Sequence, residues 1–493
     1  MKHGLLILIG LFVVAGVQGQ SSKRGMAYGH HSASDMEVLA PNVSWWYNWS
    51  VTPESSVAEV YGDYGFEFVP MTWNGKFDET KLRDFLSEHP ETKYLLAFNE
   101  PNFLEQAKMT PTEVAAQWPR LEAIADEFNL EIVAPAVNYC GDCVSENGTT
   151  YTDPFDYLDD FFAACPDCRV DYIAVHCYMN TVSALQWYID QFKKYEKPIW
   201  LTEFAGWEPN GNINNVSDQI NFMIGAVDFL ESDPDVFRYA WFIGRGDGIN
   251  SYPYIDLLGT PGTLTPLGEI YTQMPIHDEN HVVAIPATIE AEAYNKMSGV
   301  LLEQTSDNSG FANVGYLDAN DWLEYKIAVD ETGNYPIRFR VASTKNTGLQ
   351  VFIDEELALT QNISNTNGWQ SWQTFENTID LSSGEHVIRL VAVDDGFNFN
   401  WLKIGNVTGI EPALKNQDQA LKVYPNPGTG YFHIESSVAV ARLEVVNLTG
   451  ATLQSMEFER TIDLSDLPSG LYFLKAENKN GSLISTQRII IQK

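Results

Sequence analysis

A chain of 493 residues is long enough for two to four domains. Its apolar content of 44% and aromatic content of 13% predict sizeable buried cores and exclude a chain that is disordered throughout. The 66 acidic residues outnumber the 30 basic ones and give a net charge of −36. This charge argues against nucleic acid and anionic membranes as partners, because phosphate binding requires clustered cations. A neutral partner such as an uncharged polysaccharide suits this surface better.

The first residues have the pattern of a secretory signal peptide. A short basic start at Met1–His3 precedes an apolar run at 4–17, and small residues follow up to Gly19. The run is too short to span a bilayer comfortably, and no later stretch reaches membrane-spanning length. We therefore predict a signal peptide over residues 1–19 and an exported mature chain without a transmembrane segment.

Residues 20–275 alternate short apolar runs with longer stretches whose apolar residues recur at the helical spacing of three and four. This rhythm predicts a (β/α)8 TIM-type barrel, an α/β fold. A doubly wound open sheet is the competitor, which the lack of a Gly-rich loop after the first strand weakens. The eight strands are predicted at 25–29, 43–49, 66–73, 94–100, 131–137, 171–178, 199–205 and 238–244.

Beyond residue 275 the helical period disappears and alternating apolar and polar residues take over. We predict a linker at 276–288, an all-β sandwich at 289–405, a second linker at 406–420 and a small all-β sandwich at 421–493. The predicted fold is thus an α/β barrel followed by two β-sandwich domains.

Two glutamates stand where predicted barrel strands end. Glu100 closes the fourth strand in "LLAFNEPN" and Glu203 closes the seventh in "IWLTEFA". Because the carboxyl ends of barrel strands meet on one face, these carboxylates could flank a glycosidic bond, with Asn99 bonding a sugar hydroxyl. Solvated strand ends are the alternative for either glutamate alone, but the pair favours catalysis.

Other strand ends carry aromatic and hydrogen-bonding side chains that suit a sugar-binding cleft. About half of these aromatics could instead be core residues, because side chains alternate along a strand. His176 could equally be a structural histidine. The predicted substrate-binding residues are Trp45, Tyr47, Asn48, Trp49, Trp73, His176, Tyr178 and Trp241.

The order of "VSWWYNW", "FVPMTW", "LLAFNEPN", "VAPAVN", "DYIAVHCY" and "WLTEF" over residues 25–275 resembles glycoside hydrolase family 128. That resemblance implies a retaining β-1,3-glucanase with Glu100 as acid/base, Glu203 as nucleophile and Asn99 assisting. It also implies carboxyl groups roughly 5–5.5 Å apart and no cofactor for catalysis. The family more often has Asp where Asn102 stands, which is a departure outside the catalytic pair.

Residues 289–405 resemble a family 6 carbohydrate-binding module in "IEAEAY", "VGYLDANDWLEYKI", "GWQSWQTF" and "FNFNWLKI". The resemblance implies a sugar site at Tyr316, Trp369 and Asn398. It places a structural calcium at Glu290 and Glu292, whose oxygens suit that cation. A rim tryptophan without a ligand is the alternative for Trp369.

The last segment, 421–493, resembles the C-terminal sorting domain of the type IX secretion route in "VYPNP", "NLTG", "LPSGLYF" and "RIIIQK". The resemblance implies a secreted or outer-surface protein whose partner is the secretion machinery. A third sugar-binding sandwich is the alternative.

Four of the five cysteines stand in two CxxC motifs, Cys140 with Cys143 and Cys165 with Cys168. In an exported chain such motifs favour disulfides, with structural zinc and free thiols as the alternatives, and the sequence leaves the connectivity open. Cys177 is predicted to be a buried core thiol.

Taken together, the patterns predict a secreted retaining endo-β-1,3-glucanase that acts on laminarin-like polysaccharides by double displacement, with an appended glycan-binding module. One alternative is a hydrolase of another neutral β-glucan, such as a mixed-linkage glucan. The other is a non-catalytic glycan-capture protein.

Overall fold

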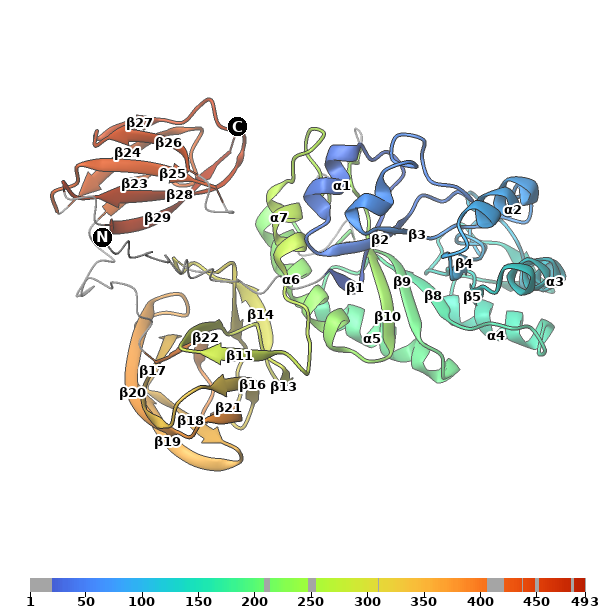
Figure 1. Ribbon diagram of the computed structural model, residues 1–493. Coiled ribbons are helices and arrows are strands. Elements are labelled where there is room, and N and C mark those ends of the chain that lie inside the picture. Colours follow the sequence, from blue (N-terminus) through green and yellow to red (C-terminus); the bar gives the residue numbers. More distant parts are fainter. Residues whose placement is uncertain are drawn as a thin grey trace, which may run out of the picture.

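The computed structural model describes residues 20–207, 213–246, 254–308, 310–405, 421–436, 438–447, 452–479 and 483–492. It contains an α/β domain, then two β domains (Figure 1). The predicted signal peptide at 1–19 and the predicted linker at 406–420 lie outside the described residues. Among the described residues, no helix combines the length and hydrophobicity needed to cross a lipid bilayer.

The parallel sheet of the first domain forms a closed, TIM-like ring. Six strands pair in the order β3-β2-β1-β10-β9-β8, and β4 pairs with β5. Isolated parallel bridges join the two sets, Met71 to Leu96 on one side and Val133 to Tyr172 on the other. The strands are β1 (Ser21–Ala27), β2 (Val43–Tyr47), β3 (Glu67–Phe68), β4 (Tyr94–Leu96), β5 (Glu131–Val133), β8 (Ile173–Cys177), β9 (Ile199–Phe204) and β10 (Val236–Trp241).

Helices follow the strands and cover the outside of the ring (Figure 1). Local sequence starts them: Thr110 caps α3 in a capping box with Glu113, and Pro111 stands at the first helical position. They are α1 (Ala33–Leu39), η1 (Tyr61–Tyr64), α2 (Glu79–Glu88), α3 (Pro111–Phe128), α4 (Pro154–Ala164), α5 (Val182–Phe192), η2 (Lys193–Tyr195), α6 (Val216–Ser232) and α7 (Pro266–Gln273). A short hairpin of β6 (Ser145–Glu146) and β7 (Thr149–Thr150) lies in the loop after β5.

The barrel core has two layers because side chains alternate along each strand. Trp45 and Trp200 pack inside the ring with Ala27 and Val133. Trp46 faces the other way, in the layer between the strands and the helices. A one-residue change in phase therefore moves a side chain from the inside of the barrel to the helix layer.

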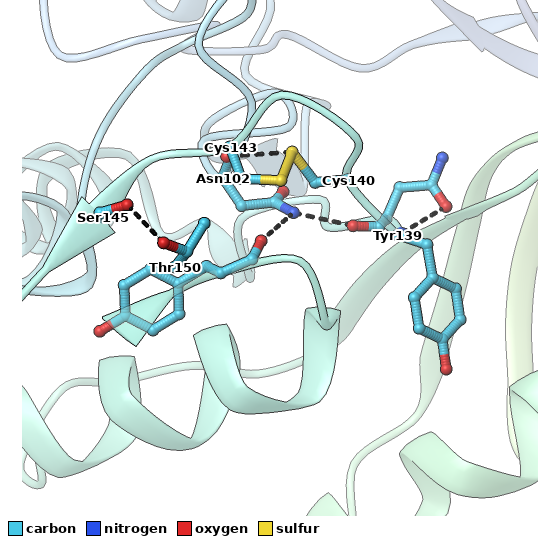
Figure 2. The surroundings of a disulfide bond; sticks show 8 residues. Asn102, Tyr139, Cys140, Cys143, Ser145 and Thr150 are labelled. Carbon is cyan, nitrogen blue, oxygen red and sulfur yellow. Dashed lines mark hydrogen bonds between the residues drawn. A yellow bond between two sulfur atoms is a disulfide. The ribbon is translucent and has the colours of Figure 1, made fainter. Parts of the chain in front are cut away.

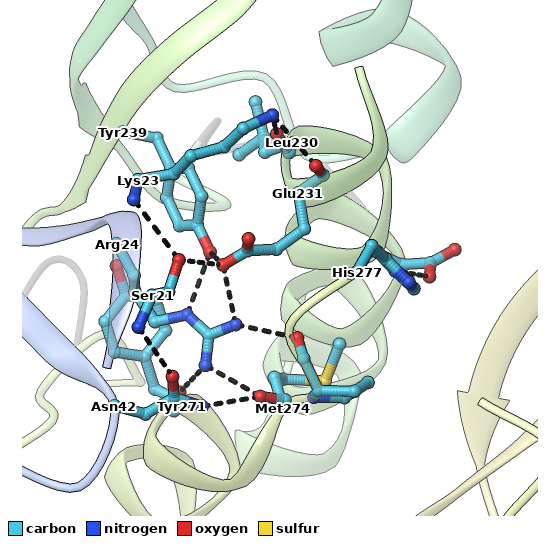
Figure 3. A network of polar contacts seen from close by, with 12 residues as sticks. Ser21, Lys23, Arg24, Asn42, Leu230, Glu231, Tyr239, Tyr271, Met274 and His277 are labelled. Atoms are coloured by element: carbon cyan, nitrogen blue, oxygen red, sulfur yellow. Dashed lines mark hydrogen bonds and ion pairs between the residues drawn. The ribbon is translucent and has the colours of Figure 1, made fainter. Parts of the chain in front are cut away.

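A buried polar network holds the first strand to the last helix (Figure 3). Arg24 in β1 is fully buried and pairs with Glu231 of α6 at 2.8 Å. Its guanidinium also donates to the main-chain oxygens of Tyr271 and Met274, at the end of α7, at 2.8 and 2.9 Å. Tyr239 in β10 donates to Glu231 at 2.5 Å. One arginine thus links the two ends of the barrel sequence.

The second domain is a sandwich of two sheets, in the orders β11-β16-β21-β18-β19 with β13, and β14-β15-β22-β17-β20 with β12. Part of the predicted linker is a strand, since Val282–Ile285 pairs in parallel with β16. The strands are β11 (Val282–Ile285), β12 (Ala287–Glu290), β13 (Lys296–Ser298), β14 (Leu301–Gln304), β15 (Ala312–Gly315), β16 (Trp322–Val329), β17 (Gly333–Ser343), β18 (Thr347–Ile353), β19 (Glu356–Ile363), β20 (Trp372–Leu381), β21 (Gly384–Ala392) and β22 (Phe397–Ile404).

The barrel and the sandwich share an interface between α6 and β14 (Figure 1). Its centre is Asp228 of α6, which is 1% exposed. His277 Nε2 lies 2.9 Å from Asp228 Oδ1, and the hydroxyl of Tyr294 donates to the same oxygen. The rings of His277 and Tyr294 are stacked with centroids 4.5 Å apart.

The third domain consists of the sheets β23-β24-β27 and β26-β25-β28-β29. Leu443, Leu474 and Ile489 pack in its small core. The strands are β23 (Leu421–Tyr424), β24 (Tyr431–Ser436), β25 (Arg442–Val446), β26 (Thr452–Glu457), β27 (Thr461–Asp463), β28 (Gly470–Glu477) and β29 (Leu483–Ile491).

Replacing Arg24 by Met should lower the free energy of unfolding by about 3–5 kcal/mol, because it leaves Glu231 buried without its charge partner. Urea denaturation measures this loss. Lys194→Ala removes an exposed ion pair to Asp159 and should cost at most about 1 kcal/mol. Equal losses in the two variants would contradict the role given to Arg24.

Candidate active site

A cleft of about 540 Å³ lies where the barrel strands end. Glu100 and Glu203 are the two charged residues among the described residues that line it, and most of the others are aromatic or amide side chains. Such a surface suits a neutral, hydroxyl-rich ligand. The lining residues are Trp49, Trp73, Asn99, Glu100, Phe103, Gln106, Asn138, Tyr139, Tyr178, Glu203, Trp207 and Phe242.

Glu100 reaches the cleft because the chain turns sharply after β4. The main-chain NH of Asn99 donates to Trp73 O and that of Glu100 to Ala136 O, each at 2.9 Å. These bonds fix the segment between its two neighbouring strands. Glu100 has a φ of 40°, a left-handed conformation that is uncommon outside glycine and occurs often at functional sites.

Glu203 reaches the cleft because β9 contains a bulge. Val175 pairs with Leu201, but His176 pairs with Glu203, so Thr202 is an extra residue in β9. Leu201 faces the helices, and strict alternation would turn Glu203 to that side too. The extra residue reverses the phase and directs the carboxylate into the barrel mouth.

His176 lies between the two carboxylates and is fully buried. Its Nδ1 is 2.9 Å from Glu100 Oε1 and 3.4 Å from Glu203 Oε2. Burial alone would lower the pKa of His176, but the negative charges of Glu203 and Glu100 outweigh it and raise that pKa above its usual value. The imidazole of His176 thus joins the two carboxyl groups through its Nδ1 atom.

Three further donors converge on Glu203. The hydroxyl of Tyr47 and the indole NH of Trp49 each donate to Oε1 at 2.8 Å, and the hydroxyl of Tyr178 donates to Oε2. Burial, together with the charge of Glu203, raises the pKa of both tyrosines well above 10, so they remain donors. The carboxylate is thereby held in one orientation with its charge balanced.

Asn99 lines the cleft beside Glu100. Its side-chain amide donates to Gln106 Oε1 at 3.3 Å, whereas its Oδ1 is buried and has no hydrogen-bond partner among the described residues. A buried acceptor without a partner is costly unless a ligand or water satisfies it. The amide of Asn99 is thus placed to contact a bound hydroxyl.

One ligand atom from each of Glu100, His176 and Glu203 lies within 4.8 Å of the others, so this group could hold a metal ion. The hydrogen bonds described above already connect its members. A cation would have to replace the contacts of His176 Nδ1 with both glutamates, so the arrangement suits two carboxyl groups joined by an imidazole better than a metal centre.

Two residues predicted to bind substrate do not reach the cleft. Trp45 is fully buried inside the barrel, where its indole NH donates to Lys23 O at 2.9 Å. Trp241 is also fully buried, but in the helix layer, where it donates to Ile255 O at 2.7 Å. The prediction was wrong for both, because one lies below the strand tip and the other points outward. Phe242, the residue after Trp241, lines the cleft instead.

Asn48 stands beside the cleft without lining it. Its amide donates to Thr52 O at 3.1 Å and to Glu54 Oε2 at 3.0 Å, so it orders the loop after β2. Trp49, which follows it, enters the cleft, as do Trp73 and Tyr178. Tyr47 and His176 lie behind the lining and contact the carboxylates.

Sequence reasoning missed several cleft residues because they lie on loops. Trp207 follows β9, stacks on Phe242 with centroids 5.1 Å apart and meets Tyr178 edge-on at 4.5 Å. These three rings form an aromatic wall near Glu203. A tryptophan four residues after the strand-end glutamate was the available signal for Trp207. The others missed are Phe103, Gln106, Asn138 and Tyr139.

In the second domain, the structure groups the predicted sugar-site residues around a glutamate that sequence reasoning did not single out, Glu303. Tyr316 and Trp369 are 63% and 49% exposed. Asn398 is buried, and its amide donates to Glu303 Oε1 at 2.5 Å and to Trp369 O at 2.8 Å. Burial and the charge of Glu303 raise the pKa of Tyr316. Two exposed rings thus stand next to an ordered polar group.

Glu290 and Glu292, the predicted calcium ligands, are carboxylates in need of a counter-charge. The Oε2 atom of each is buried and lacks a hydrogen-bond partner within the part of the chain that the structure describes. Burial, and then the charge of Asp307, raise the pKa of Glu290 to about 7, and burial with the charge of Glu290 raises the pKa of Glu292 well above its usual value. Such oxygens fit a hard cation.

The cysteines pair within each motif, Cys140 with Cys143 and Cys165 with Cys168. Figure 2 shows the first disulfide beside Asn102. Cys177 is buried and takes part in neither disulfide. The structure therefore agrees with disulfides in preference to zinc.

Comparisons with known proteins identify the families of the three domains. Residues 25–271, about half of the chain, match the family described as "Glycosyl hydrolase catalytic core". Residues 290–406 match "Carbohydrate binding module (family 6)" and residues 422–492 match "Secretion system C-terminal sorting domain". The three resemblances seen in the sequence are thus confirmed.

Among curated proteins, the chain is similar to alkali-sensitive linkage protein 1 of Schizosaccharomyces pombe, with 30% identity over 266 residues. This match covers 51% of the chain and 44% of that relative, so the chain spans less than half of the relative's length.

Among solved structures, the chain is similar to two GH128 (subgroup II) endo-β-1,3-glucanases. The one from Pseudomonas viridiflava is 39% identical with a TM-score of 0.47, and the one from Sorangium cellulosum is 44% identical with a TM-score of 0.45. Each match covers 52% of this chain and 99% of the other.

The paired carboxylates at the barrel mouth, the uncharged aromatic cleft and the match over residues 25–271 lead to one conclusion. The chain belongs to the glycosyl hydrolases of the catalytic core family.

Proposed function

We propose that the chain is a secreted, retaining endo-β-1,3-glucanase of the family 128 type that hydrolyses laminarin-like polysaccharides. The closeness of Glu100 and Glu203, whose oxygens lie within 4.8 Å of each other, carries the proposal. Inverting enzymes separate their carboxyl groups by about 6.5–9.5 Å to admit a water, whereas retaining enzymes keep them about 5–5.5 Å apart. The observed spacing supports double displacement.

In the first step, Glu203 attacks the anomeric carbon while Glu100 donates a proton to the departing glycosidic oxygen. The donors from Tyr47, Trp49 and Tyr178 hold the nucleophile in place before the attack. The product is a glycosyl-enzyme ester at Glu203 and a shortened glucan with a free hydroxyl.

In the second step, Glu100 removes a proton from water, which attacks the anomeric carbon and releases the sugar from Glu203. His176 contacts both glutamates, so it can balance their charge as the proton leaves and returns. The buried oxygen of Asn99, which lacks a hydrogen-bond partner among the described residues, would accept a bond from a sugar hydroxyl and orient the ring.

The other two domains are proposed to deliver and retain the enzyme. The family 6 module would bind glycan at Tyr316, Trp369 and Asn398 and hold a structural calcium at Glu290 and Glu292. The C-terminal domain would engage the type IX secretion machinery, which places the enzyme outside the cell or on its outer surface. Uncharged polysaccharide is the substrate class that the acidic chain and the neutral cleft walls favour.

Glu203→Ala and Glu100→Ala should each lower kcat on laminarin by about 1,000-fold or more, because each removes a group that bonds to the reacting atoms. Azide should restore turnover of Glu203→Ala and yield a glycosyl azide of inverted anomeric configuration, whereas a glycosyl azide from Glu100→Ala would have the retained configuration. Product analysis by chromatography and NMR checks both results.

Glu131→Gln is the matched control for these variants, since Glu131 stands at the far end of β5 and accepts a bond from Tyr172. It should keep wild-type activity. If the wild type cleaves a mixed-linkage glucan and leaves laminarin intact, the mechanism holds and the substrate is wrong. If no glucan is cleaved and glucans still bind, the chain captures glycans without hydrolysing them.

Trp369→Ala and Tyr316→Ala should each reduce retention on insoluble β-1,3-glucan by about tenfold, because stacking on an exposed ring is lost. Turnover of short soluble oligosaccharides should be unchanged. Leu357→Ala, at an exposed position of β19, is the control. Pull-down on particulate glucan measures retention, and unchanged retention in both the tryptophan and the tyrosine variant would move the binding site elsewhere.

Calcium added to chelated protein should raise the melting temperature of the module, by an amount equivalent to about 2.7 kcal/mol at one hundred times Kd. Glu292→Gln should abolish the increase, whereas Glu376→Gln, at an exposed position of β20, should keep it. Calorimetry with and without calcium provides the measurement. An equal calcium effect in the Glu292 variant would show that calcium binds at another place.

A further inference from the structure

The loop after β5 is joined to the loop that follows Glu100. Phe103 and Cys143 form an antiparallel bridge, and Leu104 NH donates to Asp142 O at 3.0 Å. Val144 NH donates to Asn102 O at 2.8 Å. The side-chain amide of Asn102 in turn donates to Asn138 O at 2.8 Å. Hydrogen bonds therefore join the two loops into one structural unit next to Glu100, the proposed acid/base.

The Cys140–Cys143 disulfide closes the turn of this unit. Cys140 is 8% exposed, its Sγ lies 3.5 Å from Asn102 O, and its NH donates to Thr152 O at 3.0 Å. The cross-link joins cysteines only three positions apart, so it restricts the turn itself. The disulfide thus restricts a turn that hydrogen bonds join to the segment after Glu100.

Three cleft residues depend on this unit. Phe103, Asn138 and Tyr139 all line the cleft, and the last two directly precede Cys140. Tyr139 is 39% exposed and sits edge-on to Phe155 at 6.3 Å. An exposed ring on a loop binds well only if little freedom is lost on binding. The disulfide would restrict the loop before a ligand binds, so that less conformational freedom is lost on binding.

We propose that the Cys140–Cys143 disulfide is a positioning element for glucan binding, which holds Asn138 and Tyr139 as a sugar-binding wall on the Glu100 side of the cleft. This rests on the proposed glucanase function for the identity of the ligand. Neither cysteine touches the reacting atoms, so both are positioning residues. The affinity for glucan, rather than the chemical step, is the property that the disulfide controls.

The second disulfide offers a matched control within the same domain. Cys165 and Cys168 stand at the end of α4, where Cys168 NH donates to Cys165 O at 3.1 Å. A helix that follows a barrel strand ends at the opposite face from the cleft. None of the described cleft-lining residues falls within 165–168. Removal of this disulfide should leave glucan binding unaffected.

The test compares Cys140→Ser/Cys143→Ser with Cys165→Ser/Cys168→Ser in full-length protein that also carries Glu203→Gln and Trp369→Ala. These background changes stop turnover and weaken the proposed sugar site of the module. Calorimetric titration with laminarihexaose gives Kd. We expect about a tenfold increase in Kd for the first pair and no change for the second, since loss of one ordered aromatic contact costs about 1.4 kcal/mol.

Tyr139→Ala, with both disulfides intact, keeps the test valid if the first pair folds poorly. It should weaken binding by a similar factor, and combining it with Cys140→Ser/Cys143→Ser should add little, because both changes remove the same contact. Full additivity would overturn the proposal. So would an unchanged Kd in either Tyr139→Ala or the first cysteine pair.

Hydrogen exchange of the ligand-free protein separates this proposal from the proposed function. The amides of Leu104 and Val144 should lose protection in the first cysteine pair and keep it in the second. If they stay protected, the positioning role is overturned whichever glycan the enzyme binds. If protection is lost and laminarihexaose binds no variant, including the background protein, the positioning role is supported and the assigned substrate fails.

Discussion

The close approach of two buried carboxylates is the constraint on which this active site depends. Glu100 and Glu203 face each other within 4.8 Å, and both are buried. Like charges at this distance repel unless donors compensate them. His176 contacts both groups, and three side chains from β2, the loop after it and the end of β8 donate to Glu203. Most of the residues around the two glutamates therefore serve to reduce the repulsion between their carboxyl groups.

The closed ring of strands brings these hydrogen-bond donors next to the carboxyl groups. The donors and carboxylates come from strands that are distant in sequence, so they meet only when the barrel is closed. Arg24 connects β1 to α6 and to the end of α7, which fixes the closure from the opposite ends of the domain sequence. The bulge at Thr202 then turns the side chain of Glu203 from the helix layer into the barrel mouth. Global closure and local irregularity are both required.

Sequence patterns predicted the features that depend on period and position alone. The parallel strands, the helices and the meeting of Glu100 with Glu203 at the barrel mouth are all consequences of regular strands that end in polar residues. Patterns failed where one residue of phase decides the outcome: Trp241 was expected in the cleft, and Phe242 occupies it. They also failed on loops, because the positions of Trp207 and Tyr139 depend on tertiary contacts that have no periodic signal.

Sequence patterns were also insufficient to predict the state of the cysteines and the structure of the first linker. The two CxxC motifs allowed disulfides or zinc, and only the fold shows each pair closed on itself. The linker prediction at 276–288 covered the segment between the helical pattern and the alternating strands, but Val282–Ile285 within it pairs with β16 as a strand, and His277 contacts Asp228. A segment this short has too little periodicity to show that its neighbours fix it.

The contacts of Asp228 with His277 and Tyr294 fix the orientation of the second domain relative to the barrel. A binding module on a flexible linker adopts many orientations relative to its enzyme. It can therefore bind polysaccharide chains whatever their packing. A module held against α6 by these contacts instead keeps one orientation relative to the barrel. Under the proposed function, two glucans with identical linkages but different chain packing would then be degraded at different rates.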